Sequence, residues 1–428
     1  MRQPTLATAA KAKASRTRYA DAMLAETENL TYRFARVRAR TEQLFAIASA
    51  AADHLRPIPL RHPLIFYFGH LDAFIVNTLF RGALQQAGQH EAFDDLFARG
   101  IDPADAAAAE ASGQAGWPAK REIAAYREAV QRRLQAYLRE PGPKPHHVMS
   151  LLLEHELMHQ ETLFYLIHQL PSELKHKPPG DRPAPPGLQR VNQAVTVPAG
   201  PTWLGVPPGF QDFYWDNEGP GHEAAVAAFE IDALPVTNAD YRAFMNETDA
   251  TAPFYWLSDD TFRGTFGPQP LDPMGPALVT HAQAAAYAAW AGAALPTEAQ
   301  WQRAAYGDDA KRRYPWGDAA PGPQHGNFGF QRYGPTRVGA FPAGDSAFGV
   351  AELVGNGWEW TSTPFAPYPG FAADPHYPGY SADFFDGRHM VLKGASWATD
   401  PQLLRRSFRN WFFPDYPYVY AKFRLVRA

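Results

Sequence analysis

Two histidines stand four residues apart in the run from Leu151 to Tyr165, at His155 and His159. The run contains no Pro or Gly and has apolar residues at helical spacing, so we expect a helix that presents both imidazoles on one face. Such a pair can form one edge of a metal site, although a hydrogen-bonded core pair or a solvated face gives the same pattern. Because Glu156 directly follows His155, the run also fits the His-Glu-x-x-His motif of zinc peptidases.

A third histidine, His70, follows the stretch His62–Gly69, and we expect it to stand at the start of a second helix. Alone, a histidine there is more often a helix-end or core residue. Together with the pair it would complete a three-imidazole facial site, with open positions for a substrate heteroatom and for O2. The chain has no cysteine, which excludes disulfides, thiolate ligands, iron–sulfur clusters and a Cys nucleophile.

The elements that would position these histidines are helical. Apolar residues recur at helical spacing in four segments, Tyr19–Ala52, His70–Ala87, Pro118–Leu138 and His146–Leu170. Four such segments predict an antiparallel bundle, and bundle cores commonly hold a metal between facing helices.

Proline-rich sequence then interrupts the periodicity, and we predict a helical domain at 1–170, a linker at 171–190 and a second domain at 191–428. The second domain has short alternating runs, such as Val195–Val197 and Ala225–Ile231, which predict irregular β structure. One helix is expected at Ala282–Ala291, and another begins near Thr297, where Thr297 and Gln300 form a weak capping box.

The amino-acid composition and net charge limit the kinds of molecule that the protein is expected to bind. The 428 residues are 46% hydrophobic and 14% aromatic, which is ample for packed cores, and the net charge is −4. Without a sustained Lys/Arg run, we expect no binding to nucleic acid or to an anionic membrane. No apolar stretch is long enough to span a bilayer and the amino end lacks an apolar signal core, so we expect a cytoplasmic protein with small-molecule partners.

Through His70, His155 and His159, the sequence resembles the sulfoxide synthases of thiohistidine biosynthesis, the family that makes ergothioneine, ovothiol and selenoneine. The amino half is similar to their DinB-like four-helix domain, and the carboxyl half to their formylglycine-generating-enzyme-like, C-type-lectin-related domain, which together imply an α+β multidomain fold. The motifs that carry the second likeness are Trp215–Glu218, Pro235–Asn238, Leu295–Trp301, Tyr314–Gly317, Gly355–Trp360, Lys393–Trp397 and Phe423–Arg424. This combination argues against a zinc peptidase.

The resemblance implies an oxidoreductase in which Fe(II) is held by His70, His155 and His159. The substrate would be hercynine, whose imidazole carbon receives sulfur or selenium in an O2-dependent reaction. Three neutral ligands would leave the iron cationic and would favour a thiolate or selenolate. Glu161 completes the family's His-x-x-x-His-x-Glu motif, but it points away from the histidine face, so we expect it to orient its surroundings and not to bind the metal.

Two further stretches match substrate regions of the family. Tyr377 matches the catalytic tyrosine that donates a proton or hydrogen, and Tyr380 is expected to contact substrate or water, although both could simply pack a lectin-like loop. Asn410 and Trp411 resemble the part that binds the carboxylate and the trimethylammonium of hercynine. A quaternary cation has no N–H, so an aromatic face is a suitable contact.

The second substrate is expected to be a seleno- or thio-sugar. After Trp411, relatives that use γ-glutamylcysteine have an acidic residue and an arginine, whereas this chain has an aromatic stretch that includes Phe412 and Tyr416. Sugar faces stack on aromatic rings, and a carboxylate-rich thiol would lack its bidentate arginine. Arg121 matches a region that can reach the second substrate, although an exposed helix arginine is usually only solvated.

The expectation is therefore a selenoneine-type synthase. The His62–His70 stretch is closest to the ovothiol-type enzymes, but these carry an additional methyltransferase domain that the 428 residues do not contain. An ergothioneine-type enzyme that uses γ-glutamylcysteine or cysteine is the alternative. A non-catalytic, lectin-like binding protein is a more remote one.

Overall fold

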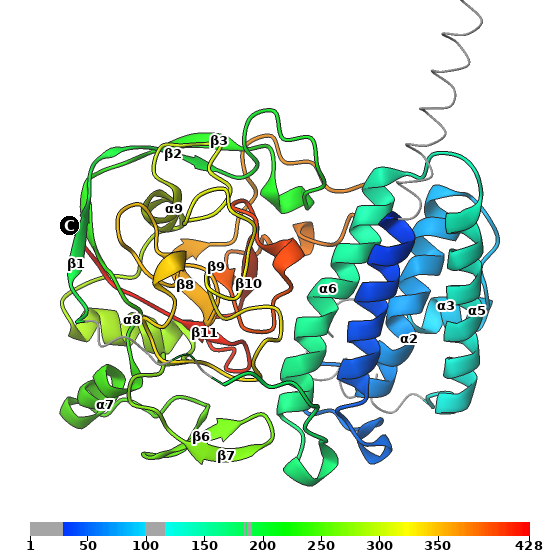
Figure 1. Cartoon of the computed structure of the whole chain (residues 1–428), viewed down its shortest axis with the longest axis horizontal. Helices are drawn as coiled ribbons and strands as arrows, with labels where there is room; N and C mark the ends of the chain where they lie inside the picture. Colours follow the sequence, from blue (N-terminus) through cyan, green and yellow to red (C-terminus); the bar gives the residue numbers. More distant parts are fainter. Residues whose placement is uncertain (1–28, 99–115, 184, 186–190) are drawn as a thin grey trace, which may run out of the picture. The chain divides into compact units, whose positions relative to one another are not determined.

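The computed structural model describes residues 29–98, 116–183, 185 and 191–428, and the part of the first predicted helix before residue 29 lies outside these ranges. The chain divides into two compact units (Figure 1). The division falls inside one helix, between Glu156 and Leu157, and the short segment Ile47–Ser49 also belongs to the second unit. Among the described residues, no helix is long and apolar enough to cross a membrane.

The first unit is built from helices, as the apolar periodicity predicts. Residues 29–45 form its first described helix. The others are α2 (Leu64–Ile75), α3 (Glu91–Leu96), α5 (Lys120–Arg139) and, up to Glu156, the first part of α6 (His146–His168). α2 packs against α5 and α3 (Figure 1). The α2 sequence is apolar nearly all round and 11 of its 12 residues are buried, so it is the central helix of this unit.

The position of His70 within its helix differs from the prediction. α2 begins at Leu64, so His70 lies in the middle of the helix and not at its start. Pro63 occupies the N-cap position with extended backbone angles, φ −65° and ψ 159°, and starts the helix there. A π-helical segment, Val76–Ala83, continues α2 directly. A mid-helix residue is held by hydrogen bonds on both sides, so His70 is more rigidly placed than a helix-end residue would be.

Within its described residues, the second unit has short strands in four small sheets, with orders β1-β4-β12, β10-β9-β8-β11, β2-β3 and β5-β6-β7. The strands are β1 (Ala194–Val197), β2 (Gly200–Leu204), β3 (His222–Val226), β4 (Phe229–Asp232), β5 (Trp256–Ser258), β6 (Thr261–Gly264), β7 (Gly267–Pro270), β8 (Gly357–Pro364), β9 (Met390–Ala395), β10 (Asn410–Phe412), β11 (Ala421–Lys422) and β12 (Val426–Arg427). The four-stranded sheet is antiparallel except for β11, which runs parallel to β8.

In the described part of this unit, the strands are accompanied by the helices α7 (Asn238–Glu247), α8 (His281–Trp290) and α9 (Glu298–Tyr306). Each is preceded by a threonine whose hydroxyl accepts a hydrogen bond from the backbone three residues on, the N-cap arrangement. The expected helices near residues 282 and 297 are present, and the Thr297–Gln300 capping box forms. α7 was missed, although Thr237 and Asp240 have capping-box spacing.

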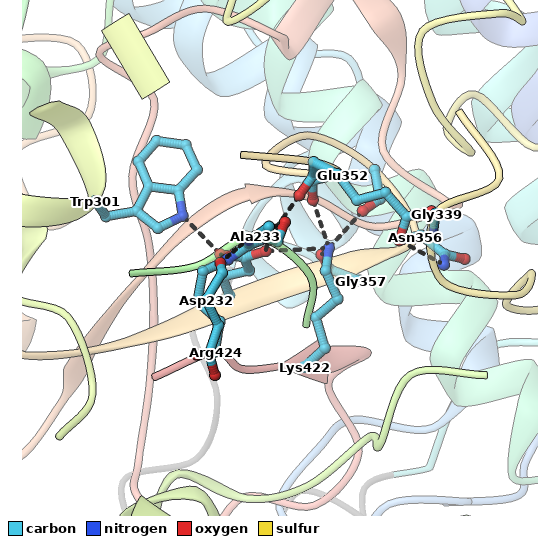
Figure 2. Close-up of polar contacts among 12 residues, drawn as sticks. Asp232, Ala233, Trp301, Gly339, Glu352, Asn356, Gly357, Lys422 and Arg424 are labelled. Carbon is cyan, nitrogen blue, oxygen red and sulfur yellow. Dashed lines mark hydrogen bonds and ion pairs between the residues drawn. The ribbon is translucent and has the colours of Figure 1, made fainter. Parts of the chain in front are cut away.

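The core of the second unit contains a buried ionic cluster (Figure 2). Arg424 donates from two nitrogens to the Glu359 carboxylate, at 2.9 and 2.5 Å. Lys422 donates to the backbone carbonyls of Glu352, Gly355 and Gly357, at 2.7–3.0 Å. Burial would raise the pKa of Glu359, but Arg424 and Lys422 outweigh it and lower that pKa. These contacts connect loops that have little regular structure, so the cluster holds the sheet that carries β8 and β11.

Candidate metal centre

Three histidine side chains come together on two helices of the bundle. His70 lies on α2, and His155 and His159 lie one turn apart on α6. Each offers one ring nitrogen, and these nitrogens all lie within 4.8 Å of one another. The residues that the sequence singled out as a ligand set are therefore adjacent, in a spacing that a single ion can bridge.

The environment of His70 fixes which nitrogen can bind a metal. Its Nδ1 is 2.7 Å from the backbone carbonyl oxygen of Phe97, so Nδ1 carries the proton and the lone pair lies on Nε2. Burial lowers the pKa of His70 to about 4, which keeps the ring neutral at pH 7. Gly69 allows the approach of Phe97, because a Cβ on Gly69 would lie 2.7 Å from the Phe97 ring.

Aromatic rings hold two of the imidazoles in place. Phe74 stacks on His155 with a centroid distance of 3.5 Å and an interplanar angle of 7°, and Phe66 stacks on His70 at 5.0 Å and 18°. Phe66 and Phe74 lie four residues before and after His70, on one face of α2. Phe66 and Phe74 were not among the predicted site residues, although their spacing is visible in the sequence.

Glu156 is engaged elsewhere and does not act with the histidines. Its carboxylate lies 3.2 Å from the Arg38 guanidinium and accepts a hydrogen bond of 2.6 Å from the Thr41 hydroxyl. In a zinc peptidase the equivalent glutamate must be available as a general base beside the metal. A buried carboxylate in an ion pair with Arg38 is not available for this, which argues against the peptidase alternative.

Glu161 is bound by three donors of the second unit, within which it lies. Its carboxylate accepts hydrogen bonds from the Trp358 indole at 2.8 Å, the Ser396 hydroxyl at 2.6 Å and the Thr399 hydroxyl at 2.7 Å. Burial raises the pKa of Glu161, although the hydrogen bonds from the three donors act to lower it. The carboxylate thus attaches the second half of α6 to strand β8 and to the loop after β9.

Tyr380, one of the two tyrosines of the predicted catalytic stretch, contacts α6. The Tyr380 hydroxyl is 3.2 Å from the Met158 sulfur, and Met158 directly precedes His159. The ring centroids of Tyr377 and Tyr380 are 5.6 Å apart. The Trp215 ring also contacts Tyr380, at a centroid distance of 4.1 Å. Tyr380 therefore has a structural contact with the helix that carries two of the histidines.

The predicted hercynine-binding residues lie at one edge of the four-stranded sheet. Asn410 and Trp411 belong to β10, which pairs only with β9 in that sheet. The Trp411 ring is 5.4 Å from Tyr380, and one of its faces is covered by Phe365, which stacks at 4.2 Å. The structure thus brings Trp411 together with Tyr380, and a cation would have to use the indole face opposite Phe365.

The predicted second-substrate residues fall into two groups. Phe412 and Tyr416 stack at 4.9 Å, and Tyr418 lies edge-on to Tyr416 at 5.2 Å, so these three rings form one aromatic cluster. Arg121, in the first turn of α5, is exposed and belongs to the first unit. Its expected reach to the second substrate stays a prediction.

Comparisons with known proteins identify the family. A family model described as a sulfatase-modifying factor enzyme 1-like domain matches residues 181–428, and the model of the DinB superfamily matches residues 33–163. A hercynine oxygenase of Mycolicibacterium thermoresistibile is 38% identical over 337 residues, which are 72% of this chain and 74% of the relative. The chain belongs to the hercynine oxygenase family.

Two other relatives support the same family assignment. The hercynine oxygenase of Mycolicibacterium smegmatis is 37% identical over 67% of this chain and 73% of its own length. The ergothioneine biosynthesis protein 1 of Neurospora crassa is 28% identical over 87% of this chain, which spans 54% of that longer protein. The predictions of an oxidative enzyme and of an α+β fold, with a DinB-like helical domain before a formylglycine-generating-enzyme-like domain, are confirmed.

The donor set of this hercynine oxygenase family member fits an Fe(II) ion. Imidazole nitrogen is a ligand type that suits iron, and three such ligands leave further coordination positions for substrate. The His70–Phe97 hydrogen bond is the outer contact that a metal-binding histidine usually has. His70, His155 and His159 would hold the ion, and it would supply the redox chemistry that activates O2.

A histidine outside this cluster gives a pH prediction. His168, at the end of α6, is buried between the Tyr420 hydroxyl and the Arg263 carbonyl, both 2.9 Å away, and burial lowers its pKa to about 3. The folded state therefore binds fewer protons than the unfolded state between about pH 6.5 and 3, so stability falls as the pH falls through this range.

Between pH 7 and pH 5, His168 should cost the folded state about 2 kcal/mol of unfolding free energy. His168→Gln, which can keep both hydrogen bonds but does not titrate there, should lose less stability than the wild type over the same interval. Urea unfolding of the metal-free protein at the two pH values measures the difference. Equal losses in the two proteins would show that His168 takes up its proton as readily in the folded state as in the unfolded state.

Proposed function

We propose that this protein is an O2-dependent synthase that joins hercynine to a selenium or sulfur donor. In the reaction, the imidazole C2–H bond and the donor Se–H or S–H bond break and a C–Se or C–S bond forms. One oxygen atom of O2 is left on the chalcogen and the other leaves as water, so O2 accepts the four electrons that the two substrates lose. The three-histidine cluster in a member of the hercynine oxygenase family carries this proposal.

The need for a metal follows from the chemistry of the substrate. An imidazole C–H bond does not react with a thiol, and O2 reacts slowly with closed-shell molecules, so a redox metal must hold the partners together. The cluster offers three neutral ligands and leaves the site cationic. A cationic site favours the anionic thiolate or selenolate of the second substrate.

Asn410 and Trp411 are proposed to bind the amino-acid end of hercynine. A trimethylammonium group cannot donate a hydrogen bond, and the exposed part of an indole face is its natural contact. The Asn410 side-chain oxygen accepts a hydrogen bond from the Trp411 backbone at 2.9 Å, which orients the amide and leaves its NH2 group to donate to a carboxylate. Both residues share strand β10, so one short strand would bind both charges.

Tyr377 is proposed as the catalytic proton donor, through its phenolic oxygen. Tyr377→Phe removes one oxygen atom from a half-buried ring and leaves the ring contact with Tyr380 in place. We expect the variant to keep metal and hercynine affinity within about threefold, because the phenol contributes to the reaction and not to ground-state binding. Product formation should fall by about 100-fold or more, with oxidation of the donor thiol in its place.

Mass spectrometry of the products and of the oxidised donor measures this diversion. Tyr380→Phe is the matched variant, since it removes the hydroxyl that contacts Met158. It should lower activity without the same change of product. If Tyr377→Phe loses the metal instead, Tyr377 supports the site and is not the proton donor.

The second substrate is proposed to be a seleno- or thio-sugar. The Phe412, Tyr416 and Tyr418 rings form an aromatic cluster directly after Trp411. Aromatic faces bind the C–H faces of sugars, whereas γ-glutamylcysteine has two carboxylates that call for charged partners. The family relatives named as hercynine oxygenases and as an ergothioneine biosynthesis protein keep the γ-glutamylcysteine or cysteine alternative open.

A competition between donors tests this choice. The Fe(II)-loaded enzyme receives hercynine, O2 and equal concentrations of a 1-seleno-sugar, a 1-thio-sugar, γ-glutamylcysteine and cysteine, and the products are identified by mass. We expect the sugar-derived product to dominate, and Phe412→Ala to reduce it by about 10-fold or more. A product derived only from γ-glutamylcysteine or cysteine would reject the sugar and keep the synthase.

A further inference from the structure

One largely buried guanidinium connects the two helices that carry the histidine cluster. Arg38, on the helix of residues 29–45, donates to the Asp72 carboxylate at 3.0 and 3.3 Å, and its Nη2 lies 3.2 Å from Glu156. Asp72 lies on α2 and Glu156 on α6. All three residues belong to the first unit, and the Asp72 side chain is fully buried.

The two carboxylates are close to the histidines along the chain. Asp72 follows His70 by two residues, and Glu156 directly follows His155. At 100° per residue, each carboxylate points to a different side of its helix from the neighbouring imidazole. The Arg38 contacts therefore act on the backbone of α2 and α6 beside the ligands, and fix how far each helix is shifted and rotated relative to the other.

We infer that Arg38 is a positioning residue for the metal centre, which it serves by holding His70 and His155 at ligand distance. A metal site tolerates errors of only a few tenths of an ångström, and His70 reaches the cluster from a different helix than the other two. The role needs a planar, forked cation, because Nη1 and Nη2 both donate to Asp72 while Nη2 also lies beside Glu156. This inference rests on the proposed metal site and adds a residue to it.

Arg127 provides a matched control in the same network. It lies on α5 and donates to the same Asp72 oxygen at 3.1 Å, and it also pairs with Glu42. The described ion pairs of Arg127 involve neither Glu156 nor any other residue of α6. Arg127→Met thus removes a buried cation from Asp72 and leaves the connection between α2 and α6 in place. Arg38→Met removes a cation from Asp72 and also breaks that connection.

The test is a Co(II) titration of the metal-free full-length protein, followed by visible absorption, together with the melting temperature of each variant. Both arginine variants should melt at a lower temperature. Arg38→Met should raise the Kd for Co(II) by about 10- to 100-fold and shift the absorption bands, while Arg127→Met should stay within about threefold. Glu156→Gln, which keeps an acceptor for Thr41 but loses its charge toward Arg38, should fall between them.

Three outcomes would overturn the inference. Unchanged Co(II) affinity in Arg38→Met would show that the cluster does not depend on Arg38, and equal weakening by both arginine variants would show a general loss of packing. If Arg38→Met does not fold, Glu156→Gln decides the matter, since unchanged affinity there rejects the bridge. Failure of the wild type to bind Co(II) would reject the metal site itself, which is the separate failure of the proposed function.

Discussion

His155→Ala should abolish tight metal binding and lower kcat/KM by about 1,000-fold or more. His155 is 2% exposed, stacks on Phe74, and supplies one of the three clustered nitrogens, so its removal leaves two ligands on separate helices. Two ligands bind a divalent ion far more weakly than three. Metal content after Fe(II) reconstitution, and turnover of hercynine, measure the two effects.

His147→Ala is the control for this substitution. His147 lies on the same helix, two turns before His155, and is exposed. It loses the same number of atoms and does not belong to the cluster, so metal content and activity should match the wild type. If His155→Ala kept a full equivalent of iron and most of its activity, the cluster would not be the metal site.

Glu161→Ala should destabilise the protein by about 3–5 kcal/mol. Trp358, Ser396 and Thr399 all donate to Glu161, and the replacement leaves these three buried donors without their acceptor. Thermal unfolding followed by tryptophan fluorescence is a suitable measurement, because the Trp358 indole itself changes environment. Glu173→Ala, at an exposed carboxylate of the same unit, should change stability by less than about 0.5 kcal/mol.

Glu161→Gln separates this role from metal binding. The amide keeps one oxygen acceptor but turns an NH2 group toward hydroxyl donors, so a smaller loss of about 1–2 kcal/mol is expected. Metal affinity should stay within about threefold of the wild type, since the carboxylate is directed at Trp358, Ser396 and Thr399. Loss of the metal in Glu161→Gln at unchanged stability would make Glu161 a ligand and would contradict this assignment.

Local sequence patterns predicted much of the site because helical spacing is a local property. The four-residue interval between His155 and His159 determines that they share a face of α6, and the apolar periodicity around them determines that α6 is a helix. Phe66 and Phe74, at four residues on either side of His70, could have been found by the same argument. So could α7, from the capping pair Thr237 and Asp240.

Local sequence patterns could not predict the tertiary contacts of the site. That His70 meets the His155–His159 pair depends on how α2 packs beside α6, which no local period encodes. The network of Arg38, Asp72 and Glu156 joins residues 34 and 118 positions apart, and the sequence shows only three charges in apolar or helical surroundings. The start of α2 was placed too late, at His70, whereas the helix begins at Leu64, directly after Pro63 at the N-cap.

The most direct test of the central claim is O2 consumption by the protein reconstituted anaerobically with Fe(II), with hercynine and the donor added separately and together. We expect rapid consumption of one O2 per product only when Fe(II), hercynine and a donor are all present, and none in the triple variant His70→Ala, His155→Ala, His159→Ala. Binding of Fe(II) without hercynine-dependent O2 consumption, whichever selenium or sulfur donor is supplied, would contradict the proposed synthase function and favour a ligand-binding protein.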